Sequence, residues 1–291
     1  MRLGAVFPHT EIGTDPSVIR DYCQAVEGLG CSHLVAYDET LLTDPDEVTG
    51  IPDFMLDFTL RKAFHEPLVL FGFIAAVTTT LELVTSVLVV TARQTGIVAK
   101  QAAEIDVLSG GRLRLGVGLG WNERAYRALG EQFETRGRRI EEQIEVLRAL
   151  WTQKTVNFKG RWHEIASLGL NPPPLQRPIP IWLGGQADKV VDRVARLADG
   201  WMPDAPPDSD MEKKLVRLRD LIGKAGRNPA TVGLEGRVSI ANKSQDAQSS
   251  EIEAWRRLGA SHVSVDTMAA GLGSITDHVK AIETFITLAR D

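Results

Sequence analysis

Residues 81–118, LELVTSVLVVTARQTGIVAKQAAEIDVLSGGRLRLGVG, contain one complete strand–helix–strand unit. The run from Leu81 to Val89 is rich in Val, Leu and Thr, a composition typical of a buried parallel strand. Apolar residues then recur at helical spacing until Gly110-Gly111, and a second apolar strand follows from Leu113 to Gly118. Parallel strands need a crossover of this length, so the stretch predicts an α/β fold.

The same unit repeats outward in both directions. The predicted strands lie at residues 3–7, 33–37, 81–89, 113–118, 179–183, 200–202, 232–240 and 262–266. A helical pattern follows each strand, with an irregular insertion at 38–65 after strand 2 and a hairpin with a proline-rich loop at 156–174 before strand 5. Eight such units predict a (β/α)₈ TIM barrel, with residues 1–291 forming a single domain.

An open, doubly wound sheet is the alternative fold. Such a sheet usually carries a glycine-rich phosphate loop after its first strand. Here that loop reads Phe7-Pro8-His9-Thr10-Glu11 and has no glycine cluster, which favours the barrel. Helix starts are marked by Asp15 followed by Pro16, and by the capping-box-like pair Ser274 and Asp277.

The composition is that of an ordinary globular protein, with 43% hydrophobic and 24% charged residues. The net charge of -5 disfavours a nucleic-acid partner, and the longest apolar run, Pro67 to Val77, is too short to span a bilayer. Cys23 and Cys31 lack metal-type spacing, and no His-x-His pair or Gly-x-Ser-x-Gly elbow occurs. We therefore expect a reduced, cytoplasmic protein without a metal site, acting on a small molecule.

Catalytic residues of such barrels lie in the loops after the strands. Gly184-Gly185-Gln186 leads from a strand into a helix start, where backbone N–H groups can approach a phosphate. Gly118 keeps the end of strand 4 open, and His9, Asp38 and Glu39 are polar side chains at the ends of strands 1 and 2. Indoles also stand at or near strand ends and would suit a flat aromatic cofactor: Trp121, Trp182 and Trp201.

Together these residues resemble the luciferase-like monooxygenase family. The likeness spans strands 1 to 6 and weakens after about Pro203. It is carried by Glu66–Leu70, Ala75–Thr78, Leu83–Leu88, Ala99–Arg112, Gly116–Trp121, Arg136–Arg139, Gly184-Gly185 and Asp199–Trp201. Within the family the chain looks most like the oxidoreductases that use the deazaflavin coenzyme F420, with FMN as the rival cofactor.

The resemblance implies three site assignments. Ser86-Val87 matches a non-prolyl cis peptide that supports the middle ring of the cofactor. Gly184-Gly185-Gln186 matches the loop that takes the cofactor phosphate, and Asp38 matches a polar position near the reactive carbon. One departure is Trp121, which stands where F420 enzymes that oxidise a sugar phosphate have an acidic residue. Sugar-phosphate oxidation is therefore disfavoured.

Hydride transfer at a carbon that bears oxygen needs a proton partner. Because the resemblance favours the position after strand 2, we rank Asp38 first, Glu39 second and His9 third. An unperturbed imidazole already titrates near ~6.5, whereas a carboxyl group, ordinarily near ~4, must be buried before its pKa approaches neutrality. Trp121 cannot transfer a proton, and we assign it to cofactor stacking or to shaping the substrate side.

Three alternatives to an F420-dependent oxidoreductase stay open. One is an FMN-dependent monooxygenase, and another is a non-catalytic flavin-binding barrel, which the polar groups at His9, Asp38 and Glu39 disfavour. A phosphate-handling isomerase barrel would bind phosphate after strands 7 and 8, where 242–244 and 267–271 give faint support.

The resemblance also implies a homodimer, because luciferase-like proteins usually pair through helices of the first half. Ile97, Val98, Ile105 and Leu108 on the third helix, beside Lys100-Gln101, permit such pairing. Most oligomers of this kind are two-fold dimers.

Overall fold

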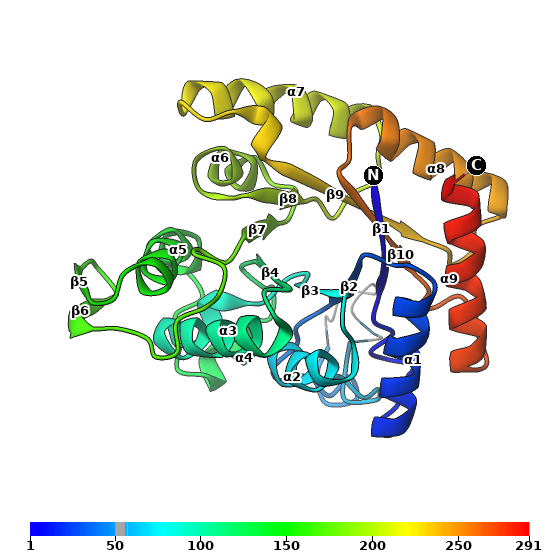
Figure 1. Cartoon of the computed structure of the whole chain (residues 1–291), viewed down its shortest axis with the longest axis horizontal. Coiled ribbons are helices and arrows are strands. Elements are labelled where there is room, and N and C mark those ends of the chain that lie inside the picture. Colours follow the sequence, from blue (N-terminus) through cyan, green and yellow to red (C-terminus); the bar gives the residue numbers. More distant parts are fainter. Residues whose placement is uncertain (50–55, 57, 291) are drawn as a thin grey trace.

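Eight parallel strands close into a barrel, surrounded by helices (Figure 1). The computed structural model describes residues 1–49, 56 and 58–290. The barrel order is β1-β10-β9-β8-β7-β4-β3-β2, and every neighbouring pair is parallel. The strands are β1 (Arg2–Val6), β2 (His33–Ala36), β3 (Glu82–Thr85), β4 (Leu113–Val117), β7 (Ile181–Gly184), β8 (Gly200–Met202), β9 (Gly233–Ser239) and β10 (His262–Asp266). The predicted (β/α)₈ fold is confirmed.

The helices cover the outside of the barrel and follow the strands as predicted. They are α1 (Pro16–Gly28), α2 (Pro67–Val77), α3 (Thr95–Ser109), α4 (Glu123–Ala128), α5 (Arg136–Thr152), α6 (Asp188–Leu197), α7 (Ser209–Lys224), α8 (Gln245–Leu258) and α9 (Ile275–Arg290). The short helix α4 was not foreseen, because six residues are too few to show a helical period.

Local side-chain chemistry sets several helix boundaries. The Asp15 carboxylate caps α1 by accepting the Ser17 backbone N–H at 2.8 Å. Gly110, with φ +72°, ends α3 in the left-handed conformation that favours glycine. At the start of α9, the Asp277 N–H donates to the Ser274 hydroxyl, which in turn donates to the Asp277 carboxylate at 2.7 Å. These three predicted boundaries are confirmed.

Both predicted insertions are present. The first follows β2 at 38–65, where residues 50–55 and 57 lie outside the described part of the chain. In the second, β5 (Val156–Lys159) pairs antiparallel with β6 (Glu164–Leu168) before β7. This hairpin lies apart from the barrel strands, at the left of Figure 1.

The predicted extent of strand 3 is wrong. β3 ends at Thr85 rather than Val89, the Ser86–Val87 peptide bond is cis as the family resemblance implied, and a 3₁₀ turn covers Val90–Ala92. The physical reason is that the chain turns across the end of β4, where the Leu88 N–H donates to the Gly116 carbonyl at 2.8 Å. A continuous Val- and Leu-rich run cannot reveal such a turn, because both conformations bury these side chains equally well.

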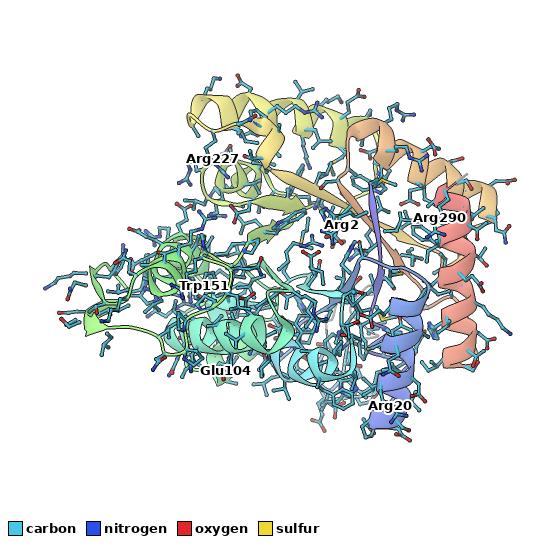
Figure 2. The ribbon with its side chains drawn as sticks, viewed as in Figure 1. Arg2, Arg20, Glu104, Trp151, Arg227 and Arg290 are labelled. Atoms are coloured by element: carbon cyan, nitrogen blue, oxygen red, sulfur yellow. The ribbon has the colours of Figure 1, made fainter. Side chains whose placement is uncertain are left out.

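The barrel interior contains two layers of different chemistry, and side chains fill the space between the strands (Figure 2). The layer nearer the N-terminal ends is ionic: Arg114 forms an ion pair with Glu235, which also contacts His33 (2.9 Å) and Ser264 (2.5 Å). Above it is an apolar layer whose buried members are Val6, Val35, Val84, Trp182, Met202 and Met268. This apolar layer forms the floor of the barrel mouth, which is the opening at the C-terminal ends of the strands.

Candidate active site

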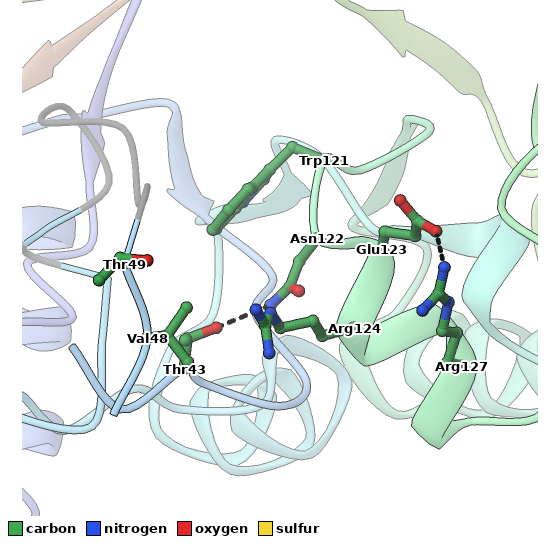
Figure 3. Close-up of a pocket in the computed structure, with 8 residues that line it drawn as sticks. All are labelled: Thr43, Val48, Thr49, Trp121, Asn122, Glu123, Arg124 and Arg127. Carbon is green, nitrogen blue, oxygen red and sulfur yellow. Dashed lines mark hydrogen bonds and ion pairs between the residues drawn. The ribbon is translucent and has the colours of Figure 1, made fainter. Parts of the chain in front are cut away.

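A pocket of about 420 Å³ opens at the C-terminal ends of the strands (Figure 3). The loops after β2 and β4 form it, and its lining residues are Thr43, Val48, Thr49, Trp121, Asn122, Glu123, Arg124 and Arg127. A second cavity of about 20 Å³, the volume of a single water molecule, lies beside it and is lined by Glu39 and Gly120, among others. Trp121 and Asn122 line both cavities and therefore separate them.

Asp38, which the sequence ranked first for proton transfer, forms hydrogen bonds through both carboxylate oxygens. One carboxylate oxygen accepts the Val89 N–H at 2.8 Å, and the other accepts the Arg93 guanidinium at 2.7 Å. Its side chain is fully buried, and Arg93 also pairs with Glu66 at 2.9 Å. Asp38 therefore ties the loop after β2 to the turn after β3.

Glu39 has a different environment from its neighbour. Its Oε1 accepts the Trp121 indole N–H at 2.7 Å. Burial raises the pKa of Glu39 to about 7, with the Trp121 hydrogen bond opposing this rise and the Asp38 charge adding to it. Both protonation states of Glu39 are consequently populated near neutral pH, which suits a group that gives or takes a proton.

The expectation that the His9 pKa suits proton transfer is wrong. His9 is fully buried and stacks on Phe64, with ring centroids 4.3 Å apart, and its Nε2 accepts the Tyr37 N–H at 3.0 Å. Burial, with His65 nearby, lowers the pKa of His9 to about 3. The imidazole therefore stays neutral near pH 7 and holds β1 against β2.

Val87 forms a platform between the ends of two strands. A Cβ atom added at Gly118 would lie 2.3 Å from Val87 Cγ2, and one added at Gly184 would lie 2.4 Å from Val87 Cγ1. Glycine at both positions therefore lets β4 and β7 approach Val87 closely. Val87, which follows Ser86, thus stands beside Gly118 and Gly184, and these are residues predicted to bind the cofactor.

The loop Gly184-Gly185-Gln186 turns sharply into α6. Gly185 has φ +107°, and α6 begins without a side-chain cap at Ala187. The Trp201 indole N–H donates to the Gly185 carbonyl at 2.7 Å and so supports this loop from inside. Gln186 is exposed.

Of the three indoles expected at or near the mouth, Trp121 lines the pocket, whereas Trp182 and Trp201 are buried. Trp201 is fully buried beneath the glycine loop. Trp182 lies inside the barrel, where the Arg114 guanidinium stands 4.3 Å from its ring centroid. Side chains alternate between the inside and the outside of a strand, and nearness to a strand end does not say which way an indole points.

A polar network that was not predicted from the sequence joins the ends of β2, β9 and β10. The Tyr37 hydroxyl donates to Asp266 at 2.8 Å and accepts from Arg237 at 3.0 Å, and Arg237 also pairs with Asp204. Burial raises the pKa of Tyr37 well above its ordinary value, so its hydroxyl stays protonated. Their positions near the C-terminal ends of β2, β9 and β10 were a signal that could have identified them.

Comparison with known proteins shows the family to which the chain belongs. A family model described as luciferase-like monooxygenase matches residues 3–281. The chain belongs to this family. As a luciferase-like protein it is an oxidoreductase, in agreement with the resemblance. Within residues 1–49, 56 and 58–290, no group of three or more His, Cys, Asp or Glu side chains could hold a metal ion, and no helix is both long and apolar enough to cross a membrane.

Relatives of this luciferase-like chain differ in their cofactors. An uncharacterized protein of Mycobacterium tuberculosis is 35% identical over 224 residues, covering 76% of this chain and 77% of the relative. The FMNH₂-dependent dimethylsulfone monooxygenase of Pseudomonas putida is 35% identical over 134 residues, 45% of this chain and 36% of that protein. An F420-dependent secondary alcohol dehydrogenase, solved with an F420-acetone adduct, has a TM-score of 0.79 at 16% identity, with 100% of this chain and 99% of that chain covered. At that identity the last similarity shows the fold alone.

Proposed function

We propose that this luciferase-like protein is an F420-dependent oxidoreductase, which moves a hydride between the deazaflavin and a small organic substrate. Glu39 gives or takes the accompanying proton. The observation that carries the proposal is the Glu39 carboxyl group, which lies at the barrel mouth with a pKa of about 7 beside an open pocket. This reverses the order of Asp38 and Glu39 expected from the sequence.

The residues at the mouth fit a flat, phosphate-bearing cofactor. Val87, with Gly118 and Gly184 packed against it, offers a platform for a ring above the apolar layer. Gly185 and Gln186, followed by the uncapped start of α6, present backbone N–H groups suited to a phosphate. Asp188 in the first turn of α6 adds a negative charge there, which Arg217 offsets at 2.8 Å. When bound, the cofactor supplies the hydride chemistry, and the protein supplies position and protons.

Glu39 and Asp38 have different roles in the proposed reaction. When a substrate hydroxyl is oxidised, its O–H proton moves to Glu39 as the carbon-bound hydrogen leaves as hydride, and reduction of a carbonyl reverses both movements. Asp38 does not move a proton, because both its oxygens are engaged by Val89 and Arg93. Its role is to hold Glu39 in place.

A second candidate function is FMN-dependent monooxygenation. The 35% identity to the Pseudomonas putida enzyme supports it, although the match covers only 36% of that protein. The same platform and glycine loop would accept FMN, so these residues do not separate the two cofactors. The non-catalytic flavin-binding barrel and the phosphate-handling isomerase barrel lack such support.

Calorimetric titration of the purified protein with F420 and with FMN tests the proposal. We expect tighter binding of F420, and tight FMN binding with no F420 binding would assign the monooxygenase function instead. Gly185→Val should bind neither cofactor, because a branched side chain would cover the backbone donors. Gly226→Val is the matched control, since Gly226 also has a positive φ (+72°) but lies after α7, away from the mouth.

We also infer that the chain pairs through α2 and α3. Val69, Ile97 and Leu108 on these helices are 72%, 55% and 62% exposed. The predicted pairing face is corrected in part, because Val98 and Ile105 are buried against the barrel. Sedimentation velocity at micromolar concentration should show a dimer that Leu108→Glu weakens, and a monomer throughout would contradict this inference.

A further inference from the structure

The Trp121 side chain lies between the two cavities of the mouth and contacts both. Figure 3 shows its ring forming one wall of the 420 Å³ pocket, above Thr43 and Val48. Its indole N–H points the other way and donates to Glu39 Oε1 at 2.7 Å. Trp121 follows Gly120, whose φ of +63° turns the chain after β4 toward the loop that carries Glu39. Two segments 82 residues apart in the sequence are thus joined by one hydrogen bond.

Within the described residues, this indole N–H is the one hydrogen-bond partner of the Glu39 carboxyl group. Asp38 contrasts with it, because its two oxygens accept from a backbone N–H and a guanidinium. A hydrogen bond donated to a carboxylate favours the ionised form. Where only one such bond exists, removing it should have a large effect on proton affinity.

The titratable groups closest to Glu39, which are Asp38, Arg93 and Tyr126, are already engaged. Asp38 on the same loop is paired with Arg93, which follows the 3₁₀ turn and also pairs with Glu66 at the start of α2. From α4, Tyr126 lines the small cavity, and its hydroxyl contacts Thr91 and the Leu119 carbonyl. Beyond Trp121, the α4 residues Glu123, Arg124 and Arg127 line the large pocket, where Glu123 pairs with Arg127.

We propose that Trp121 is a positioning residue that sets the proton affinity of Glu39 through its indole N–H. Its importance for turnover rests on the proposed function, but its effect on Glu39 does not, because it exists in the protein without cofactor or substrate. The same ring lines the large pocket, so one side chain both shapes the substrate side and holds the acid–base group. Sequence reasoning assigned only the first of these roles.

A direct measurement of Glu39 ionisation tests the proposal. Carboxyl carbons labelled with ¹³C in glutamate are followed by NMR as pH is varied, and the Glu39 signal is assigned by its loss in Glu39→Gln. In the unchanged protein the Glu39 midpoint should lie near 7. In Trp121→Phe, which keeps an aromatic wall but lacks the donor, we expect the midpoint to rise by about one to two pH units.

Two further variants keep this test decisive. Trp162→Phe is the matched control: Trp162 lies between β5 and β6 beside Arg161, and its replacement should leave the Glu39 midpoint unchanged. If Trp121→Phe does not fold, a benzothienylalanine residue at position 121 replaces the N–H by sulfur in a ring of nearly the same shape. The midpoint should again rise.

A midpoint equal to that of the unchanged protein, in either position-121 variant, would overturn the proposal. Failure of the proposed function gives a different result. In that case Glu39→Gln would retain full turnover with an identified substrate, while the midpoint in Trp121→Phe would still rise. The two hypotheses are therefore separable.

Discussion

Each end of the barrel holds a glutamate, buried at one end (Glu235) and half-buried at the other (Glu39), and the two carboxyl groups differ in their proton affinity. At the lower end, where the strands begin, Glu235 is 5% exposed and accepts hydrogen bonds from Arg114, His33 and Ser264. Burial alone would raise the pKa of Glu235, but the Arg114 charge and these hydrogen bonds lower it well below its ordinary value. At the upper end, where the strands finish, the neutral Trp121 indole is the one donor to Glu39 among the described residues, and burial raises the pKa of Glu39 to about 7.

Burial by itself therefore does not decide whether a carboxyl group is ionised near neutral pH. A carboxylate surrounded by a cation and several donors stays ionised and serves as a structural anchor. A carboxyl group with a single neutral donor beside a cavity can exchange its proton near neutral pH, and such perturbed groups in clefts mark functional sites. The lower end of this barrel therefore has the surroundings of a structural anchor, and the upper end has those of the proposed proton-transfer group.

The largest expected effect is on turnover at the upper end. Glu39→Gln should reduce turnover by ~10²–10⁴ while cofactor affinity changes by no more than a few-fold. His9→Gln serves as the comparison, since a neutral histidine with a structural role should affect stability more than the chemical step. Steady-state kinetics and calorimetry measure the two quantities separately. Normal turnover in Glu39→Gln would mean that the proton comes from water or another residue.

At the lower end, the expected effect is on stability instead. Arg114→Met leaves Glu235 buried without its cation, and removal of one partner of a buried pair costs about 3–5 kcal/mol of unfolding free energy. Urea denaturation measures this loss, and cofactor affinity of the folded protein should not change. Lys213→Met, which removes a fully exposed partner of Asp210, is the control and should have little effect. A destabilised Lys213→Met or a stable Arg114→Met would remove the distinction between the two ends.

The two glutamates should also respond to pH with opposite sign. The folded-state pKa of Glu39, about 7, lies above the ordinary 4.5, so its stabilising contribution is present below 4.5 and is lost as pH rises through 7. Between about pH 5 and about pH 8 the unchanged protein should lose about 1–3 kcal/mol relative to Glu39→Gln. The Glu235 contribution is instead present above 4.5 and lost as pH falls through its lowered pKa. Urea unfolding at both pH values measures the first difference, and equal losses in both proteins would contradict it.

The smallest expected effect concerns the shape of the upper end. Gly118→Ala forces Val87 to move, because the added Cβ would lie 2.3 Å from Val87 Cγ2, and we expect a cost of about 1–3 kcal/mol in unfolding free energy. If this contact is the cause, the same substitution should cost much less in a Val87→Ala background. A double-mutant cycle measured by urea denaturation checks this. Additive effects would show that the strain arises elsewhere.

The sequence by itself determined the barrel and the edge at which the site lies. Apolar periodicity along 81–118 and its repeats predicted eight strand–helix units, and Asp15, Gly110 and the Ser274–Asp277 pair marked helix boundaries. These features depend on contacts within a few residues, or on which face of an element is apolar. A single chain segment therefore carries enough information to predict them.

Only the tertiary structure distinguished the surroundings of the three polar candidates for proton transfer. Asp38 and Glu39 are adjacent in the sequence, yet one meets Arg93 and the other meets Trp121, and His9 becomes neutral in an apolar surrounding. A pKa depends on the burial of a group and on charges and donors within a few ångströms, and here these come from other strands of the barrel. Sequence spacing does not reveal which side chains converge in space, and so it could indicate the barrel edge that holds the candidate site but not the surroundings of each side chain there.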